Sequence, residues 1–222
     1  MPSNRYPLIA REAWTILSIL LVLTVLAQFL VGSVTFFILL SILSVAIYLF
    51  RDPNRVIPSQ PLAIVSPVHG IITLIEEAEE IRLHNQTLRV QITMRAHDIY
   101  SFRSPIEGKV IDQWSSLPDK NESRRHFDFH LKSDEGDSVV TAIRLKDIVR
   151  RFHMYLHSGE RTGQGQRCGY FYTGCVVDVF IPLESKLQVE VGQYVQSGST
   201  ILAQIIHSEV ARAIQSHDFE SS

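Results

Sequence analysis

The sequence predicts a mainly β protein, in which an N-terminal transmembrane helical hairpin precedes a β-rich domain with a barrel-sandwich-like C-terminal part. An uncharged apolar run occupies residues 13–50, many short apolar runs separated by turn residues follow, and helical periodicity is scarce after the first run. We therefore divide the chain into an N-terminal tail (1–12), a membrane hairpin (13–50), a β-rich domain (51–206) and a polar tail (207–222).

The apolar run contains no charged residue and ends at Arg51. As one helix it would extend roughly 57 Å, almost twice the hydrocarbon thickness of a bilayer. Gly32-Ser33 lies at its midpoint, so we expect two spans of about 18 residues joined by a turn. Arginines flank both outer ends and none lies in the turn, which predicts cytoplasmic termini and an inner (cytoplasmic) membrane location. Because such spans are short, a re-entrant or interfacial hairpin remains the alternative.

Seven apolar runs after residue 51 predict the strands of the β-rich domain. They are IITLIEE, LRVQITM, GKVIDQW, SVVTAIRL, CVVDVFIP, KLQVEV and STILAQII. The stretch YFYTGCVVDVFIP (170–182) is typical of one buried strand interrupted by Gly174 and Cys175. A short helix is the only other element that we expect, near residues 146–156.

Two segments carry repeated turn signals. SPVHGII (66–72) and SPIEGKV (104–110) share Ser-Pro-x-x-Gly before a strand, which we interpret as shared turn chemistry. VEVGQYVQSGSTILA (189–203) places glycines at two turns, as in the small β-barrels of biotinyl and lipoyl carrier domains. No lysine lies in the segment 193–198 that would carry a cofactor, so a carrier role lacks an attachment point.

Composition and spacing argue against several functions. The net charge of −2 without a polybasic segment argues against nucleic-acid binding, and GQGQRCG lacks the spacing of a phosphate-binding loop. Cys168 and Cys175 form no CxxC pair, and their odd separation would place them on opposite faces of one strand, so we expect no disulfide. HFDFH (126–130) could align three metal ligands, but a solvated strand face explains the alternation better, and we predict no metal site.

A series of motifs resembles one family in order along the chain. The series begins with IAREAW, the apolar hairpin, FRDPNRVIP and SPVHG, and it continues with MRAHDIYSFRSP (94–105), Asn121-Glu122, Arg150-Arg151, GQRCGYFYTGCVVDVFIP and VGQYVQSGSTILA. Over residues 9–206 the chain resembles the short bacterial, pyruvoyl-dependent phosphatidylserine decarboxylase proenzyme.

The resemblance implies a self-cleaving precursor that acts on a membrane phospholipid. Proenzymes of this family cut themselves between Gly and Ser at the position of Gly174-Cys175, and the serine becomes an N-terminal pyruvoyl group. This ketone is the built-in cofactor that accepts electrons when phosphatidylserine loses carbon dioxide and becomes phosphatidylethanolamine. Cys175 would therefore be both the nucleophile and the source of the cofactor. Gly174 would adopt a strained conformation that opens its carbonyl to attack.

Three substitutions fall on the self-cleavage residues of this family. Cys175 replaces the serine, His69 replaces the acidic residue of Pro-x-Asp-Gly, and Tyr100 replaces the histidine of the Asp-x-His segment. In one interpretation the thiol, which ionises more readily than a hydroxyl, cleaves with help from His69. In the other, the chain is a catalytically silent homologue that binds lipid or regulates a true decarboxylase. Homo-oligomerisation or association with such a decarboxylase is compatible with both interpretations.

Overall fold

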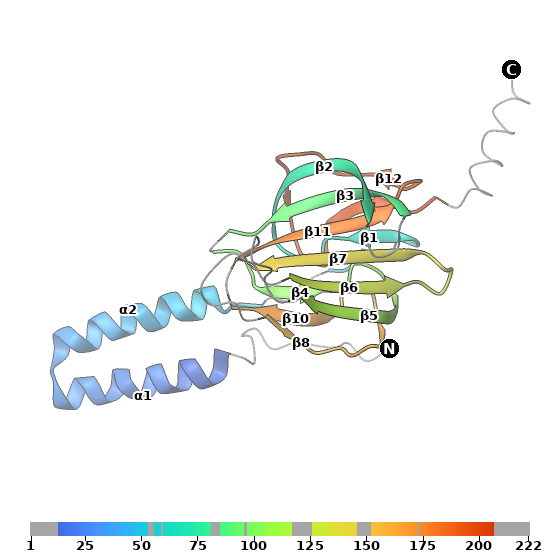
Figure 1. Ribbon diagram of the computed structural model, residues 1–222. Helices are drawn as coiled ribbons and strands as arrows, with labels where there is room; N and C mark the ends of the chain where they lie inside the picture. Colours follow the sequence, from blue (N-terminus) through green and yellow to red (C-terminus); the bar gives the residue numbers. More distant parts are fainter. Residues whose placement is uncertain are drawn as a thin grey trace, which may run out of the picture. The chain divides into compact units, whose positions relative to one another are not determined.

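The computed structural model describes residues 13–52, 56–58, 60–80, 85–95, 97–116, 126–145, 152–172 and 174–206. The chain divides into a helical unit, which lies within residues 1–55 and includes His97–Tyr100, and a β unit formed by the rest (Figure 1). This arrangement confirms a mainly β protein with two N-terminal helices. The predicted tails (1–12 and 207–222) lie outside the described residues.

The helical unit is a hairpin of α1 (Trp14–Leu30) and α2 (Ser33–Leu49). The predicted turn is confirmed, because Gly32 has a φ of 117°, a conformation that a residue with a side chain resists. Most apolar side chains of both helices are exposed, and those of Phe29 and Leu30 are 81% and 78% exposed. Each helix has 17 residues, and within the described residues no helix is both long and apolar enough to cross a membrane.

The β unit contains one large sheet and two small ones. The large sheet has the order β13-β2-β3-β11-β7-β6-β5-β9, and the small sheets have the orders β1-β14-β12 and β4-β10-β8. The strands are β1 (Ala63–Val65), β2 (Gly70–Glu80), β3 (Asn85–Thr93), β4 (Ser101–Arg103), β5 (Gly108–Ser116), β6 (His126–Lys132), β7 (Ser138–Leu145), β8 (Phe152–Met154), β9 (Arg161–Thr162), β10 (Arg167–Phe171), β11 (Cys175–Pro182), β12 (Lys186–Leu187), β13 (Tyr194–Val195) and β14 (Ile201–Gln204).

Most predicted runs form strands, and two local expectations are wrong. SVVTAIRL and CVVDVFIP coincide with β7 and β11. The predicted helix at 146–156 is instead β8 over the described residues 152–154, while residues 146–151 lie outside the described residues. The stretch 170–182 is not one strand, because β10 pairs with β4 and β8 whereas β11 pairs with β3 and β7. Alternation of apolar residues cannot show that the chain changes sheets between two runs.

The β unit is an internal duplication. The large sheet has the same order from both edges if β13, β2, β3 and β11 are matched with β9, β5, β6 and β7. Matching β1, β14 and β12 with β4, β10 and β8 makes the two small sheets equivalent as well. Each small sheet carries a register shift at the matching place, between Ile64 and Val65 and between Arg167 and Gly169. The repeated Ser-Pro-x-x-Gly segment therefore marks two structural repeats, which is more than the shared turn chemistry that we expected.

The two turns show the duplication in atomic detail. Ser66 Oγ donates to the Val68 carbonyl at 2.7 Å, and Ser104 Oγ donates to the Ile106 carbonyl at 2.6 Å. The turns also pair with each other, since the backbone N–H of Val65 donates to Pro105 and that of Arg103 donates to Pro67, both at 2.9 Å. These reciprocal bonds relate the repeats by an approximate two-fold axis.

Candidate functional site

The predicted cleavage site lies at one end of the large sheet, where β3 finishes. Thr93, the last residue of β3, pairs with Ile71 of β2 on one side and with Val176 of β11 on the other. His69 directly precedes β2, and Cys175 is the first residue of β11. Because β2 and β11 both flank β3, two interstrand spacings separate them, or about 10 Å. The sheet therefore places His69 and Cys175 at the same end of the two strands that flank β3.

Cys175 is fully buried and contacts Met94, the residue that follows β3. The Cys175 thiol donates to Met94 Sδ at 3.2 Å, and the Met94 backbone N–H donates to the Cys175 carbonyl at 3.0 Å. These contacts join positions 81 residues apart in the sequence and hold the thiol at the beginning of β11. The sequence analysis did not identify Met94 as a site residue. Its position in the motif MRAHDIYSFRSP was the only feature of the sequence that pointed to it.

Gly174 directly precedes Cys175, and few atoms of the described residues lie close to its Cα. The strained conformation expected of Gly174 stays a prediction. Among the described residues, a Cβ added to Gly174 would meet only the Met94 carbonyl oxygen, at an ordinary 3.5 Å. Packing against the described residues therefore does not require glycine here. Glycine differs from other residues at this position because it has no side chain to shield its peptide carbonyl.

His69 belongs to a rigid turn and is 2% exposed. The three carbonyls before it all accept hydrogen bonds: Gly198 N–H donates to Ser66, Ser197 Oγ donates to Pro67, and Ser66 Oγ donates to Val68. Gly70 follows and approaches β3 so closely that an added Cβ would lie 2.5 Å from the Thr93 carbonyl oxygen. The backbone at His69 is thus fixed against the end of β3.

Tyr100 directly precedes β4 and is 8% exposed. It belongs to the segment His97–Tyr100, which is grouped with the helical unit. Within the β unit, Met94 contacts Cys175, and His69 lies at the same end of the large sheet. The candidate role of Tyr100 stays a prediction.

Asp178 is a second feature that sequence reasoning missed. Its side chain is 4% exposed and lies in β11, three residues after Cys175. It accepts a hydrogen bond from Gln91 at 2.9 Å and forms ion pairs with Arg89 of β3 and Arg144 of β7. The strand that begins with Cys175 is therefore tied to both neighbouring strands. In the sequence, the one feature that pointed to Asp178 is its charge within the otherwise apolar run CVVDVFIP.

The second cysteine, Cys168, is also fully buried. Cys168 lies in β10 and not in the strand of Cys175, so the opposite-face argument was wrong, although both cysteines are free thiols. Burial raises the pKa of the Cys168 thiol to about 11, which keeps it protonated at neutral pH.

Sequence comparison relates the chain to known proteins. A sequence model of the phosphatidylserine decarboxylase family matches residues 42–203. A phosphatidylserine decarboxylase proenzyme from Nitrosomonas eutropha is 30% identical over 90% of this chain and 96% of its own length. The proenzymes from Burkholderia lata and Paraburkholderia xenovorans are 31% and 29% identical, again over 90% of this chain, and the alignments cover 97% and 98% of their own lengths. No solved structure matches the chain.

Proposed function

Because the chain belongs to the phosphatidylserine decarboxylase family, we propose that it cleaves itself at Gly174-Cys175 and then converts phosphatidylserine to phosphatidylethanolamine. The observation that carries this proposal is the Gly174-Cys175 junction, where a thiol held by Met94 adjoins a glycine that packing does not require. Cysteine can supply the three carbon atoms of a pyruvoyl group, so the residue present fits the cofactor of the family. That group would provide the electron sink for decarboxylation.

Maturation would use only atoms of this chain and water. The thiol adds to the Gly174 carbonyl and displaces the Cys175 nitrogen, which leaves as an amine and converts the peptide bond into a thioester. Loss of the α-proton of Cys175 then breaks its Cβ–S bond, leaving a thiocarboxylate on Gly174 and dehydroalanine at position 175. Water converts dehydroalanine to the ketone and releases ammonia. The sulfur therefore stays with the larger chain, whereas a serine would leave oxygen there.

His69 would supply the acid–base function during cleavage. His69 directly precedes β2 and Cys175 begins β11, and these two strands lie about 10 Å apart, a separation that an imidazole and a thiol extended toward the end of β3 can bridge. The imidazole would take the thiol proton and return it to the departing Cys175 nitrogen. Tyr100, at the position of the family histidine, would serve as a hydrogen-bond donor instead of a base, since a phenol is neutral near pH 7.

The intact mass of the purified full-length protein under denaturing conditions tests this proposal. We expect two chains, one of residues 175–222 with a pyruvoyl end and one of residues 1–174 that ends in a thiocarboxylic acid or its hydrolysis product. Cys175→Ala should remain a single chain, whereas Cys168→Ala should still be cleaved. A single wild-type chain after prolonged incubation would contradict the proposal.

That outcome would favour a second function, which one observation supports. The Cys175 thiol is fully buried and donates a hydrogen bond to Met94 Sδ, as expected of an inert thiol in a folded core. An uncut chain would then be a catalytically silent homologue that binds lipid, or regulates a true decarboxylase. Liposome binding without decarboxylation would identify it.

The helical hairpin would attach the protein, whether cleaved or uncut, to the cytoplasmic membrane, with the β unit on the cytoplasmic side. Most of the exposed side chains of the hairpin are apolar, and two of its hydroxyls bond internally: Thr24 Oγ1 donates to the Leu20 carbonyl at 2.7 Å and Ser44 Oγ donates to the Leu40 carbonyl at 2.8 Å. Arg51 at the end of α2 donates to the Tyr48 carbonyl at 2.9 Å, a position suited to the interface. In vesicle flotation, Val22→Asp in α1 should reduce membrane binding, whereas Val56→Asp in the β unit should not. Equal flotation of the two variants would contradict this attachment.

A further inference from the structure

Met94 approaches the Gly174-Cys175 junction with three different atoms. Its Sδ accepts a hydrogen bond from the Cys175 thiol at 3.2 Å, and its backbone N–H donates to the Cys175 carbonyl at 3.0 Å. Its carbonyl oxygen lies 3.5 Å from the place that a Cβ on Gly174 would take. Met94 and Cys175 are 4% and 0% exposed, so their sulfur atoms meet inside the core. Met94 therefore lies against both residues of the bond whose cleavage we propose.

The second repeat has the same backbone contact with different side chains. The backbone N–H of Ser133 donates to the Asp137 carbonyl at 2.8 Å, as that of Met94 donates to the Cys175 carbonyl. Gly136 precedes Asp137, just as a glycine precedes Cys175. Ser133 therefore corresponds to Met94, and Asp137 corresponds to Cys175.

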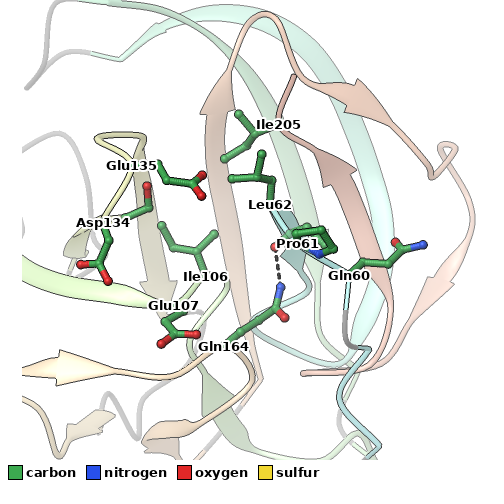
Figure 2. A pocket seen from close by; sticks show the side chains of 11 residues that line it. Gln60, Pro61, Leu62, Ile106, Glu107, Asp134, Glu135, Gln164 and Ile205 are labelled. Atoms are coloured by element: carbon green, nitrogen blue, oxygen red, sulfur yellow. Dashed lines mark hydrogen bonds between the residues drawn. The ribbon is translucent and has the colours of Figure 1, made fainter. Parts of the chain in front are cut away.

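The side chains at these counterpart positions are polar and partly exposed. Ser133 Oγ donates to Asp137 Oδ2 at 3.3 Å and accepts the Asp137 backbone N–H at 3.1 Å. A cavity of about 370 Å³ lies beside this pair, and its lining includes Ser133 and Glu107, which occupies the place of His69 in the second repeat (Figure 2). The fold thus brings the two side chains together in both repeats, but it does not require them to be buried sulfur atoms.

We infer that Met94 is a positioning residue for self-cleavage, whose thioether holds the Cys175 thiol in one rotamer beside the scissile bond. The inference rests on the proposed cleavage and adds the residue that orients its nucleophile. A sulfur atom only 3.2 Å away leaves the thiol little room to rotate about its Cα–Cβ bond.

The magnitudes favour positioning over any cost to ionisation of the thiol. A thioether is a weak acceptor, so its hydrogen bond stabilises the neutral thiol of Cys175 only slightly. Displacement of a reacting group by about 1 Å can slow a reaction roughly 10²-fold. Loss of the thioether should therefore slow cleavage, although the thiol would ionise a little more readily.

Replacement of one sulfur atom in full-length protein made by cell-free synthesis with detergent tests this role. In the Met154→Leu variant, Met94 is the only methionine after Met1. Selenomethionine at these positions keeps an acceptor of the same kind, whereas norleucine substitutes a methylene with nearly the same shape. Intact mass at successive times measures the fraction of cleaved chains, and circular dichroism checks folding.

We expect the norleucine protein to be cleaved roughly tenfold more slowly than the methionine protein, or slower still, because the thiol is no longer held. The selenomethionine protein should be cleaved at a rate close to that of the methionine protein. Met94→Leu, with a side chain of similar volume, should behave as the norleucine protein does. Met154→Leu with ordinary methionine is the matched control and should be cleaved as fast as the wild type.

Two results would overturn the inference and leave the proposed function standing. One is equal cleavage of the norleucine and methionine proteins. The other is equally slow cleavage of the selenomethionine and norleucine proteins, because an acceptor at position 94 would then be irrelevant. A wild-type chain that stays uncut would instead overturn the proposed function, and the role of Met94 in cleavage with it.

Discussion

At the scale of single residues, burial should make the Cys168 thiol unreactive. The pKa of the Cys168 thiol is raised to about 11 from a usual value of 9.0, because the thiolate loses its hydration in the core. At pH 8 the thiolate fraction should therefore be about a hundredfold smaller than in the unfolded chain. Cys168 in the Cys175→Ala variant should resist iodoacetamide at pH 8 and react once the protein is unfolded in urea. Equal alkylation rates in the folded and unfolded protein would contradict this.

His130 should make the β unit sensitive to acid. Its side chain is buried and stacks on Trp114, and desolvation lowers its pKa from 6.5 although Asp112 and Glu80 act in the opposite direction. The unfolded chain therefore takes up a proton at this histidine before the folded protein does, so stability is lost as the pH falls below 6.5. The free energy of unfolding should fall less steeply between pH 6.5 and 5 in His130→Phe than in the wild type. Parallel curves for the two proteins would contradict the prediction.

At the scale of elements, the two Ser-Pro-x-x-Gly turns should respond alike to mutation. A Cβ at Gly70 or Gly108 would lie 2.5 Å or 2.2 Å from a carbonyl oxygen of the neighbouring strand, and neither backbone can move without breaking the sheet. Gly70→Ala and Gly108→Ala should each destabilise the protein by about 2 kcal/mol or more in urea unfolding. Gly163→Ala is the matched control, because its nearest neighbour would be a flexible side-chain atom at 3.6 Å. A neutral effect at only one turn would argue against their equivalence.

The ion pairs of Asp178 should matter most for strand β11. Asp178→Asn removes the buried carboxylate that pairs with both Arg89 and Arg144 and should cost about 3 kcal/mol, as expected when the buried member of an ionic cluster loses its charge. Glu76→Gln removes the exposed partner of Arg89 instead and should cost less than about 1 kcal/mol. Urea unfolding of both variants compares these costs. Similar losses would mean that the cluster does not hold the strand.

At the scale of the whole molecule, cleavage at Gly174-Cys175 should leave the two chains together. Residues 175–206 contribute β11 to β14, and these strands pair with β1, β2, β3 and β7 of the other chain. If cleavage occurs, both chains should elute as one complex from size-exclusion chromatography and separate only under denaturing conditions. Separate elution of the smaller chain in native buffer would show that strand pairing does not hold the two chains together after cleavage.

The sequence by itself determined the local elements. The uncharged run with Gly32 at its midpoint predicted the helical hairpin, and apolar runs bounded by turn residues predicted β7 and β11, because these features depend on neighbouring residues. The motifs also located the Gly174-Cys175 junction. The role of the three substitutions stays a prediction.

Only the tertiary structure decided which strands lie side by side. It separates β10 from β11 and pairs β3 with β11, although the second repeat lies between these two strands in the sequence. This pairing places Met94 against Cys175 across 81 positions of sequence. The tertiary structure also forms the cavity at Glu107 as a counterpart of the cleavage site. Local periodicity carries no information about such pairings, since they depend on hydrogen bonds and packing between segments distant in the chain.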